Sequence, residues 1–238
     1  FAPPVEVTFQ PWVKAWAEAC TGLNCDGLSR GFWNSVRITV PSVVISIMIA
    51  SVNGYALANW RFKGSEVFFT ILIFGAFIPY QVMLYPLVIL LRDLGLYGTL
   101  WGLVIVHTIF GMPILTLLFR NYYCNVPHKL FQAARIDGAG PLRFFKDVLL
   151  PLSKTSMAAL FVIQFIYGWN QYLWPLLMTT TEDMYPVVMG IKRMFAGGDA
   201  ANEWNVIMAT AILAMIPPAL VVVLMQKWFV KGLVDTEK

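Results

Sequence analysis

Charged residues are scarce in this sequence. Asp, Glu, Lys and Arg make up 13% of its 238 residues and hydrophobic residues 58%, whereas a soluble domain carries roughly 25% charged residues. One soluble core cannot bury that much apolar surface, so the composition predicts an all-α, polytopic membrane protein. The basic residues lie between apolar runs rather than on one face, which argues against a nucleic-acid partner.

Motifs for catalysis and nucleotide binding are also missing. The sequence has no G-x-x-x-x-G-K-[ST], so it does not bind ATP by that route, and it has no H-E-x-x-H or G-x-S-x-G. The two histidines, His107 and His128, are far apart and give no metal signature. Asp137 and Asp147 are better explained as solvated charges than as paired catalytic carboxylates. We therefore expect no catalytic residue, metal or cofactor, and no enzymatic activity in this chain.

Cysteine is rare, with three residues at Cys20, Cys25 and Cys124. The first two are close enough to form a disulfide if their segment faces an oxidising compartment, and two unpaired thiols are the alternative. No signal peptide is visible after Phe1. We expect that part of the natural N-terminus precedes this residue.

Five apolar runs free of Asp, Glu, Lys and Arg are each long enough to cross a membrane, which takes about 20 helical residues. They are residues 38–60, 67–91, 94–119, 155–180 and 204–226. Prolines at positions 79, 86, 113, 175, 217 and 218 predict kinks or breaks in these helices.

The basic residues predict the orientation of the chain. Of the 17, 11 fall on one side of the apolar runs and the remaining 6 on the other. Because cytoplasmic loops are enriched in Lys and Arg, we expect residues 120–154 to be cytoplasmic. Residues 1–37 then form an external segment, with an amphipathic helix near residues 11–20, and residues 38–238 form the transmembrane domain.

Amides and aromatic rings interrupt the run at residues 155–180, in the sequence YGWNQYLWP. Polar side chains at membrane depth face other helices or a water-filled path. Amides can hydrogen-bond sugar hydroxyls, and aromatic rings can cover the apolar faces of a sugar. The alternative is interhelical hydrogen bonding with an interfacial aromatic belt. The candidate substrate-path residues are Gln81, Gln164, Trp169, Asn170, Gln171 and Trp174.

Residues 131–151, FQAARIDGAGPLRFFKDVLLP, form a polar island between apolar runs. Residues 129–136 favour a helix, Gly138 and Gly140 end it, and Pro141 begins another. A polar helix–turn–helix held at a membrane surface indicates a docking surface for a soluble partner.

This island resembles the EAA motif, E-A-A-x-x-D-G-A followed by a hydrophobic stretch ending in Leu-Pro, of permease subunits of binding-protein-dependent ABC importers. The resemblance implies that it is the cytoplasmic coupling helix, which sits in a cleft of the ATPase. The coupling residues would be Gln132, Ala133, Ala134, Asp137, Gly138 and Ala139. Gln132 departs from the pattern, because the family usually has Glu there.

The whole chain resembles carbohydrate-type permeases similar to the second subunit of maltose importers. The resemblance implies six spans, one of them before Phe1, in the inner membrane of a bacterium. It also implies partners: a pair of ATP-binding subunits, a second permease subunit, an external solute-binding protein and the membrane lipid. The cargo would be a sugar or sugar-like phosphate, moved by alternating access.

The two halves of the chain resemble permeases for different substrates. The half after Gln132, including EWNVIMATAILAMIPPALVVVL, resembles glycerol-3-phosphate permeases. The half before it, including CTGLNCDGLSRGFWNSVRITVPS, resembles glucose/mannose permeases. The C-terminal resemblance is the closer and favours glycerol-3-phosphate. A secondary carrier independent of an ATPase is a further alternative, but it would be expected to show intramembrane charges or inverted repeats.

Overall fold

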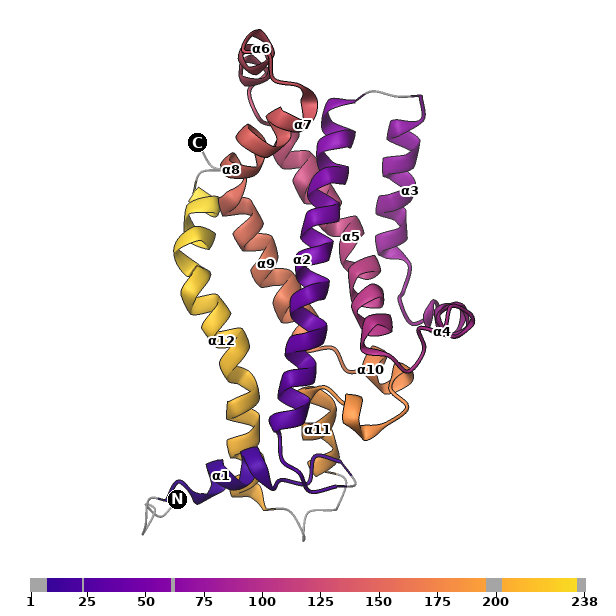
Figure 1. Ribbon diagram of the computed structural model, residues 1–238, viewed down its shortest axis with the longest axis vertical. Helices are drawn as coiled ribbons and strands as arrows, with labels where there is room; N and C mark the ends of the chain where they lie inside the picture. Colours follow the sequence, from indigo (N-terminus) through magenta and orange to yellow (C-terminus); the bar gives the residue numbers. More distant parts are fainter. Residues whose placement is uncertain (1–7, 23, 61–62, 196–202, 235–238) are drawn as a thin grey trace.

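The computed structural model describes residues 8–22, 24–60, 63–195 and 203–234, and all regular structure in these ranges is helical. This confirms the predicted all-α class. Four helices run lengthwise beside one another and form the body of the molecule (Figure 1). They are α2 (Ser29–Asn59), α5 (Leu100–Cys124), α9 (Lys154–Trp169) and α12 (Trp204–Val234).

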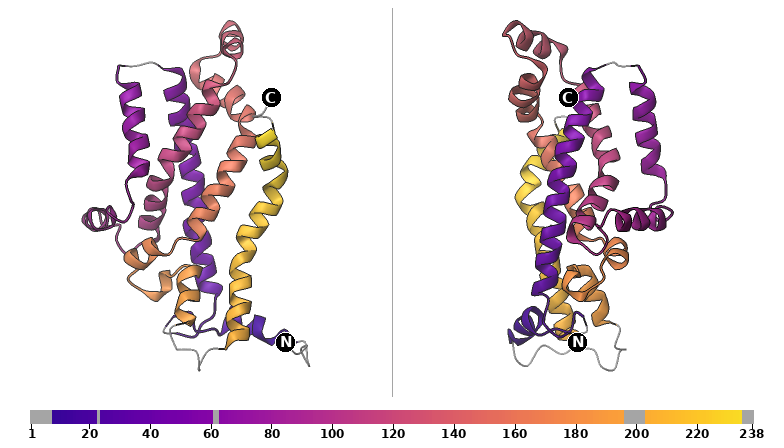
Figure 2. Two further views of the ribbon diagram at one scale, coloured as in Figure 1. Left: turned by 180° about the vertical axis from the view of Figure 1, so that it is seen from behind. Right: turned by 45° about the vertical axis from the view of Figure 1, so that its right-hand side comes forward.

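Shorter elements occupy the two ends and one side of this body (Figure 1). One end carries α1 (Gln10–Ala17), α10 (Leu173–Met178), η2 (Glu182–Met184) and α11 (Val187–Met194). The opposite end carries α6 (His128–Ile136), α7 (Pro141–Phe144), η1 (Phe145–Leu149) and α8 (Leu150–Leu152). Beside the body lies α3 (Ser65–Phe77), followed by α4 (Leu84–Asp93), which runs across the long helices rather than along them (Figure 2).

Among the described residues, three helices are long and apolar enough to cross a membrane: α2, α5 and the part of α12 at Trp204–Trp228. A fourth crossing arises if Pro141–Leu152 and Lys154–Trp169, bent by 72°, are one span. Helix α3, with 13 residues, is shorter than the roughly 20 residues that a straight crossing needs. Five apolar runs therefore do not give five uninterrupted helices.

The apolar run at residues 67–91 is broken in the structure, as its prolines predict. Helix α3 ends at Phe77 and α4 begins at Leu84, with Pro79 between them. Proline lacks a backbone N–H and disfavours helix in the residue before it, so the chain turns there. The run at residues 155–180 is likewise divided, because α9 ends at Trp169 and α10 begins at Leu173.

The remaining helix bounds follow the sequence more closely. Helix α2 begins at Ser29, ahead of the predicted start at residue 38. Helix α5 continues through Pro113, and α12 continues through Pro217 and Pro218, so these prolines do not end their helices. Pro86 and Pro175 lie in the first turns of α4 and α10, where a proline costs no intrahelical hydrogen bond.

Helices α2 and α5 pack closely along a face of small residues. A Cβ atom at Gly54 would lie 2.6 Å from Cβ of Phe119 and 2.9 Å from the backbone nitrogen of Arg120. Buried hydroxyls on α2 bond within their own helix, as where Ser46 Oγ donates to the carbonyl of Ser42 at 2.6 Å. Small residues that let two backbones approach are the usual basis of helix association in membranes.

We predict that Gly54→Ala destabilises the protein, because the added methyl group overpacks the contact with Phe119 at a cost of about 1–3 kcal/mol. Gly75→Ala is the matched control, since a Cβ there meets no atom within 4 Å. Thermal unfolding of the detergent-purified protein measures both. Equal melting temperatures for the two variants would contradict close packing at Gly54.

Candidate functional site

Helix α6 projects beyond the ends of the long helices and closes with a well-formed C-cap (Figure 1). Gly138 has φ 76° and donates its N–H to the Arg135 carbonyl at 3.0 Å, and Ala139 donates to the Ala134 carbonyl at 2.8 Å. This pair of bonds is the Schellman motif, which needs a left-handed residue that glycine adopts without strain. Gly138 thus turns the chain back toward the body.

The two faces of α6 differ in exposure. Phe131 and Ala134 are partly buried against the body, and the Phe131 ring meets Phe144 edge-on with centroids 5.1 Å apart. The opposite face is open, and Ile136 on it is 86% exposed. Helix α6 therefore combines a face packed on the body with a face that no described residue covers.

The predicted coupling residues divide between these faces. Gln132, Ala133, Asp137 and Gly138 are exposed, whereas Ala134 and Ala139 are partly buried. Leu142, at the start of the next helix, is 78% exposed and extends the apolar character of this end. The sequence pattern did not single out Ile136 or Leu142, because an isolated apolar residue carries no motif.

An aromatic cluster at the C-terminal ends of α2 and α5 holds the segment that follows α6 in place. The Tyr55 hydroxyl donates to the Pro141 carbonyl at 2.9 Å, and its ring stacks on Phe145 at a centroid distance of 5.0 Å. Tyr123 lies edge-on to Phe145 at 6.5 Å. The Tyr122 hydroxyl donates to the Leu152 carbonyl at 2.9 Å. The stretch from α7 to α8 is therefore held at both of its ends by the long helices α2 and α5.

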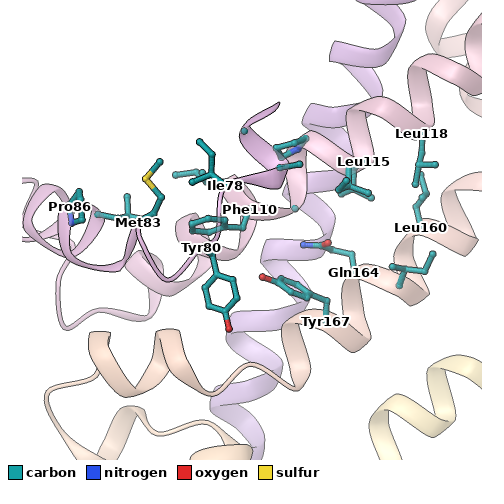
Figure 3. Close-up of a pocket in the computed structure, with 18 of the residues that line it drawn as sticks. Ile78, Tyr80, Met83, Pro86, Phe110, Leu115, Leu118, Leu160, Gln164 and Tyr167 are labelled. Atoms are coloured by element: carbon teal, nitrogen blue, oxygen red, sulfur yellow. The ribbon is translucent and has the colours of Figure 1, made fainter. Parts of the chain in front are cut away.

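A cavity of about 620 Å³ lies where the α3–α4 break meets α5 and α9. Its lining is mostly apolar, but it includes the side chains of Tyr80, Gln164 and Tyr167 (Figure 3). Gln164 is 5% exposed and donates its amide to the His107 carbonyl at 3.4 Å. Gly111 leaves room for that amide, because a Cβ there would overlap it.

The predicted substrate-path residues do not gather at one place. Gln164 lines this cavity, but Gln81 is exposed and outside its lining. Trp169 is buried and donates its indole N–H to the Ala214 carbonyl at 3.1 Å, as the alternative of interhelical hydrogen bonding described. Asn170 bonds its own helix at Ile166, 2.9 Å away.

The remaining two predicted substrate-path residues, Trp174 and Gln171, also lie outside the cavity lining. Trp174 is fully buried in the hydrophobic core, with its ring 5.3 Å from that of Phe110, and Gln171 is partly exposed. Tyr80 was not singled out from the sequence, and Tyr167 opens the stretch YGWNQYLWP but was not among the substrate-path candidates. A signal existed for Tyr167, because it follows Gln164 by three residues and so lies on the same helical face.

The opposite end of the molecule is braced by covalent and ionic contacts. Cys20 and Cys25 are joined as a disulfide, and the backbone N–H of Asn24 between them donates to Glu182 at 3.3 Å. Lys14 of α1 pairs with Glu203 at 2.5 Å. The contacts with Glu182 and Glu203 bind the segment before α2 to the chain between α10 and α12, and the disulfide closes a loop within that segment.

Comparison with known proteins identifies sequence relatives over most of the chain. Residues 42–235 match the family described as "Binding-protein-dependent transport system inner membrane component". The "sn-glycerol-3-phosphate transport system permease protein UgpE" of Brucella melitensis is 47% identical over 211 residues, covering 89% of this chain and 74% of the relative. The protein of the same name from Agrobacterium fabrum is 46% identical over the same shares.

Two solved structures of ABC transporters have a fold similar to that of this chain. A bacterial ABC transporter involved in the import of the acidic polysaccharide alginate matches with TM-score 0.79 and 26% identity, over 95% of this chain and 81% of the other. The MetNI methionine ABC transporter shares the fold, with TM-score 0.64 and 18% identity over 84% and 93% of the two chains. The chain therefore belongs to the family of inner membrane components of binding-protein-dependent transport systems.

Proposed function

We propose that the chain is a permease subunit of an ATP-driven importer for sn-glycerol-3-phosphate and that helix α6 couples it to the ATPase. The observation that carries the coupling role is the projecting helix α6, which has the EAA-like sequence and an exposed apolar face. The substrate is supported by the names of relatives that are 46–47% identical. These relatives favour glycerol-3-phosphate over the glucose/mannose alternative.

The geometry of α6 suits a coupling role in two ways. Ala133 is exposed and small, which permits close approach of a partner, and Ile136 supplies apolar contact area. The aromatic contacts through Phe131, Tyr55 and Phe145 tie α6 and α7 to α2. A displacement imposed on α6 by the ATPase is therefore passed to the membrane helices instead of being absorbed by a loose loop.

The full assembly that we propose contains a pair of ATP-binding subunits at the α6 end and a second permease subunit beside this chain. An external solute-binding protein would meet the opposite end, which the Cys20–Cys25 loop, α1 and α11 form. Alternating access then follows from ATP-driven closure of the ATPase pair. The excess of basic residues on its side of the apolar runs supports a cytoplasmic location for the α6 end.

Replacing Ile136 tests the docking face. We expect Ile136→Asp to abolish ATP-driven uptake, because a carboxylate would be desolvated in the interface, while membrane insertion and melting temperature stay unchanged because the side chain is 86% exposed. Ile136→Leu is the matched control and keeps uptake. Normal uptake by Ile136→Asp in proteoliposomes with the complete importer would contradict the docking role.

The turn at Gly138 provides a second test. Gly138→Asn retains most of the uptake, since Asn tolerates a left-handed conformation. Gly138→Pro abolishes it, because proline fixes φ near −65° and this position has φ 76°. Membrane fractionation confirms that both variants insert. Equal uptake by the two variants would show that the turn is not needed.

The native cysteines test the orientation. Cys124 at the end of α5 is free and exposed, so we expect a membrane-impermeant maleimide to label it in inverted vesicles. Cys20 and Cys25 should react in right-side-out vesicles after reduction of their disulfide. The Cys124→Ser variant identifies the first signal. Labelling of Cys124 from the outside would reverse the proposed orientation.

A further inference from the structure

Three uncharged polar side chains line one apolar cavity (Figure 3). Gln164 and Tyr167 extend from one face of α9, and Tyr80 approaches from the chain break between α3 and α4. Two phenol hydroxyls and a carboxamide can each donate and accept hydrogen bonds. The volume of about 620 Å³ falls within the roughly 300–1,000 Å³ typical of small-molecule sites.

The Gln164 amide has hydrogen-bonding capacity to offer a ligand. Its bond to the His107 carbonyl, 3.4 Å long, is beyond the usual range of about 2.7–3.2 Å and therefore weak. The side chain is nonetheless fixed, because it is 5% exposed and sits against the backbone of Gly111. A buried amide with a weak partner gains most by bonding a ligand at the same place.

The absence of charge on the cavity lining indicates which part of the substrate the cavity can hold. Every side chain that lines the cavity in the described part of the chain is uncharged. A phosphate placed here would be desolvated without a cation, which is costly, whereas a hydroxyl needs only hydrogen-bond partners. The cavity therefore matches the polyol part of a substrate rather than its anionic part.

We propose that Tyr80, Gln164 and Tyr167 form a specificity site that recognises the carbon-bound hydroxyls of glycerol-3-phosphate. The phosphate then extends out of this cavity, toward a cation that another chain of the importer supplies. The inference rests on the proposed function, because it presumes glycerol-3-phosphate as cargo. It assigns the three residues to the hydroxyl end and leaves charge recognition to a partner.

The test combines variants with substrate analogues that lack the C1 or the C2 hydroxyl. Uptake is measured in proteoliposomes holding the complete importer, with each compound at a concentration that saturates the binding protein. The quantity compared is the ratio of uptake for glycerol-3-phosphate to uptake for each deoxy analogue. Selection by the binding protein is common to all variants and cancels when their ratios are compared.

In the unmodified importer we expect a ratio of at least about tenfold for one analogue or both, as for other sites that bond a substrate hydroxyl. Gln164→Leu and Tyr167→Phe should each reduce that ratio to within about threefold of unity, because the group that detects the hydroxyl is gone. Gln81→Leu is the matched control; it is exposed and outside the cavity, so its ratio should stay as in the unmodified importer.

An unchanged ratio in Gln164→Leu and Tyr167→Phe would overturn the inference, even if uptake itself falls. Equal losses for all compounds would indicate that the residues contact the phosphate or act through structure. If Gln164→Leu does not assemble, Tyr167→Phe, which keeps the ring, decides the question alone. Absence of glycerol-3-phosphate uptake by the unmodified importer would instead refute the proposed function.

Discussion

The contact between α2 and α5 at Gly54 is the constraint on which the rest of this molecule depends. With no side chain at Gly54, the backbone of α2 reaches Phe119 and Arg120 of α5. The next residue, Tyr55, is thereby placed to bond the Pro141 carbonyl and to stack on Phe145. Neighbouring residues of α2 therefore pack this helix against α5 and support the projecting α6 segment.

Breaks in the helices create the cavity. A backbone inside a bilayer must satisfy its own hydrogen bonds, so an interrupted helix is tolerated where protein surrounds it or where it borders a cavity. The chain leaves α3 after Phe77, and Tyr80 in the following turn reaches the cavity that Gln164 also lines. The same break that prevents a straight fifth span thus supplies one wall of the proposed specificity site.

The sequence predicted the features that depend on local chemistry. The apolar runs identified the helical class, and the glycines of the polar island identified the turn, which the structure shows as a Schellman cap at Gly138. Features that depend on long-range packing were not accessible. Trp169 and Trp174 share a polar, aromatic stretch with Asn170, yet both are buried in the core. Packing against α5 determines which face of α9 borders the cavity, and the hydropathy of the sequence does not reveal that face.

Helix α6 is the proposed point of contact with the ATPase, and site-directed crosslinking tests this contact most directly. A photoreactive maleimide can be attached to Ala133→Cys in a Cys124→Ser background, within the assembled importer. Ala133 is exposed on α6, so we expect a crosslink to the ATP-binding subunit. Crosslinks confined to the permease chains or to lipid, with the complex intact, would contradict it.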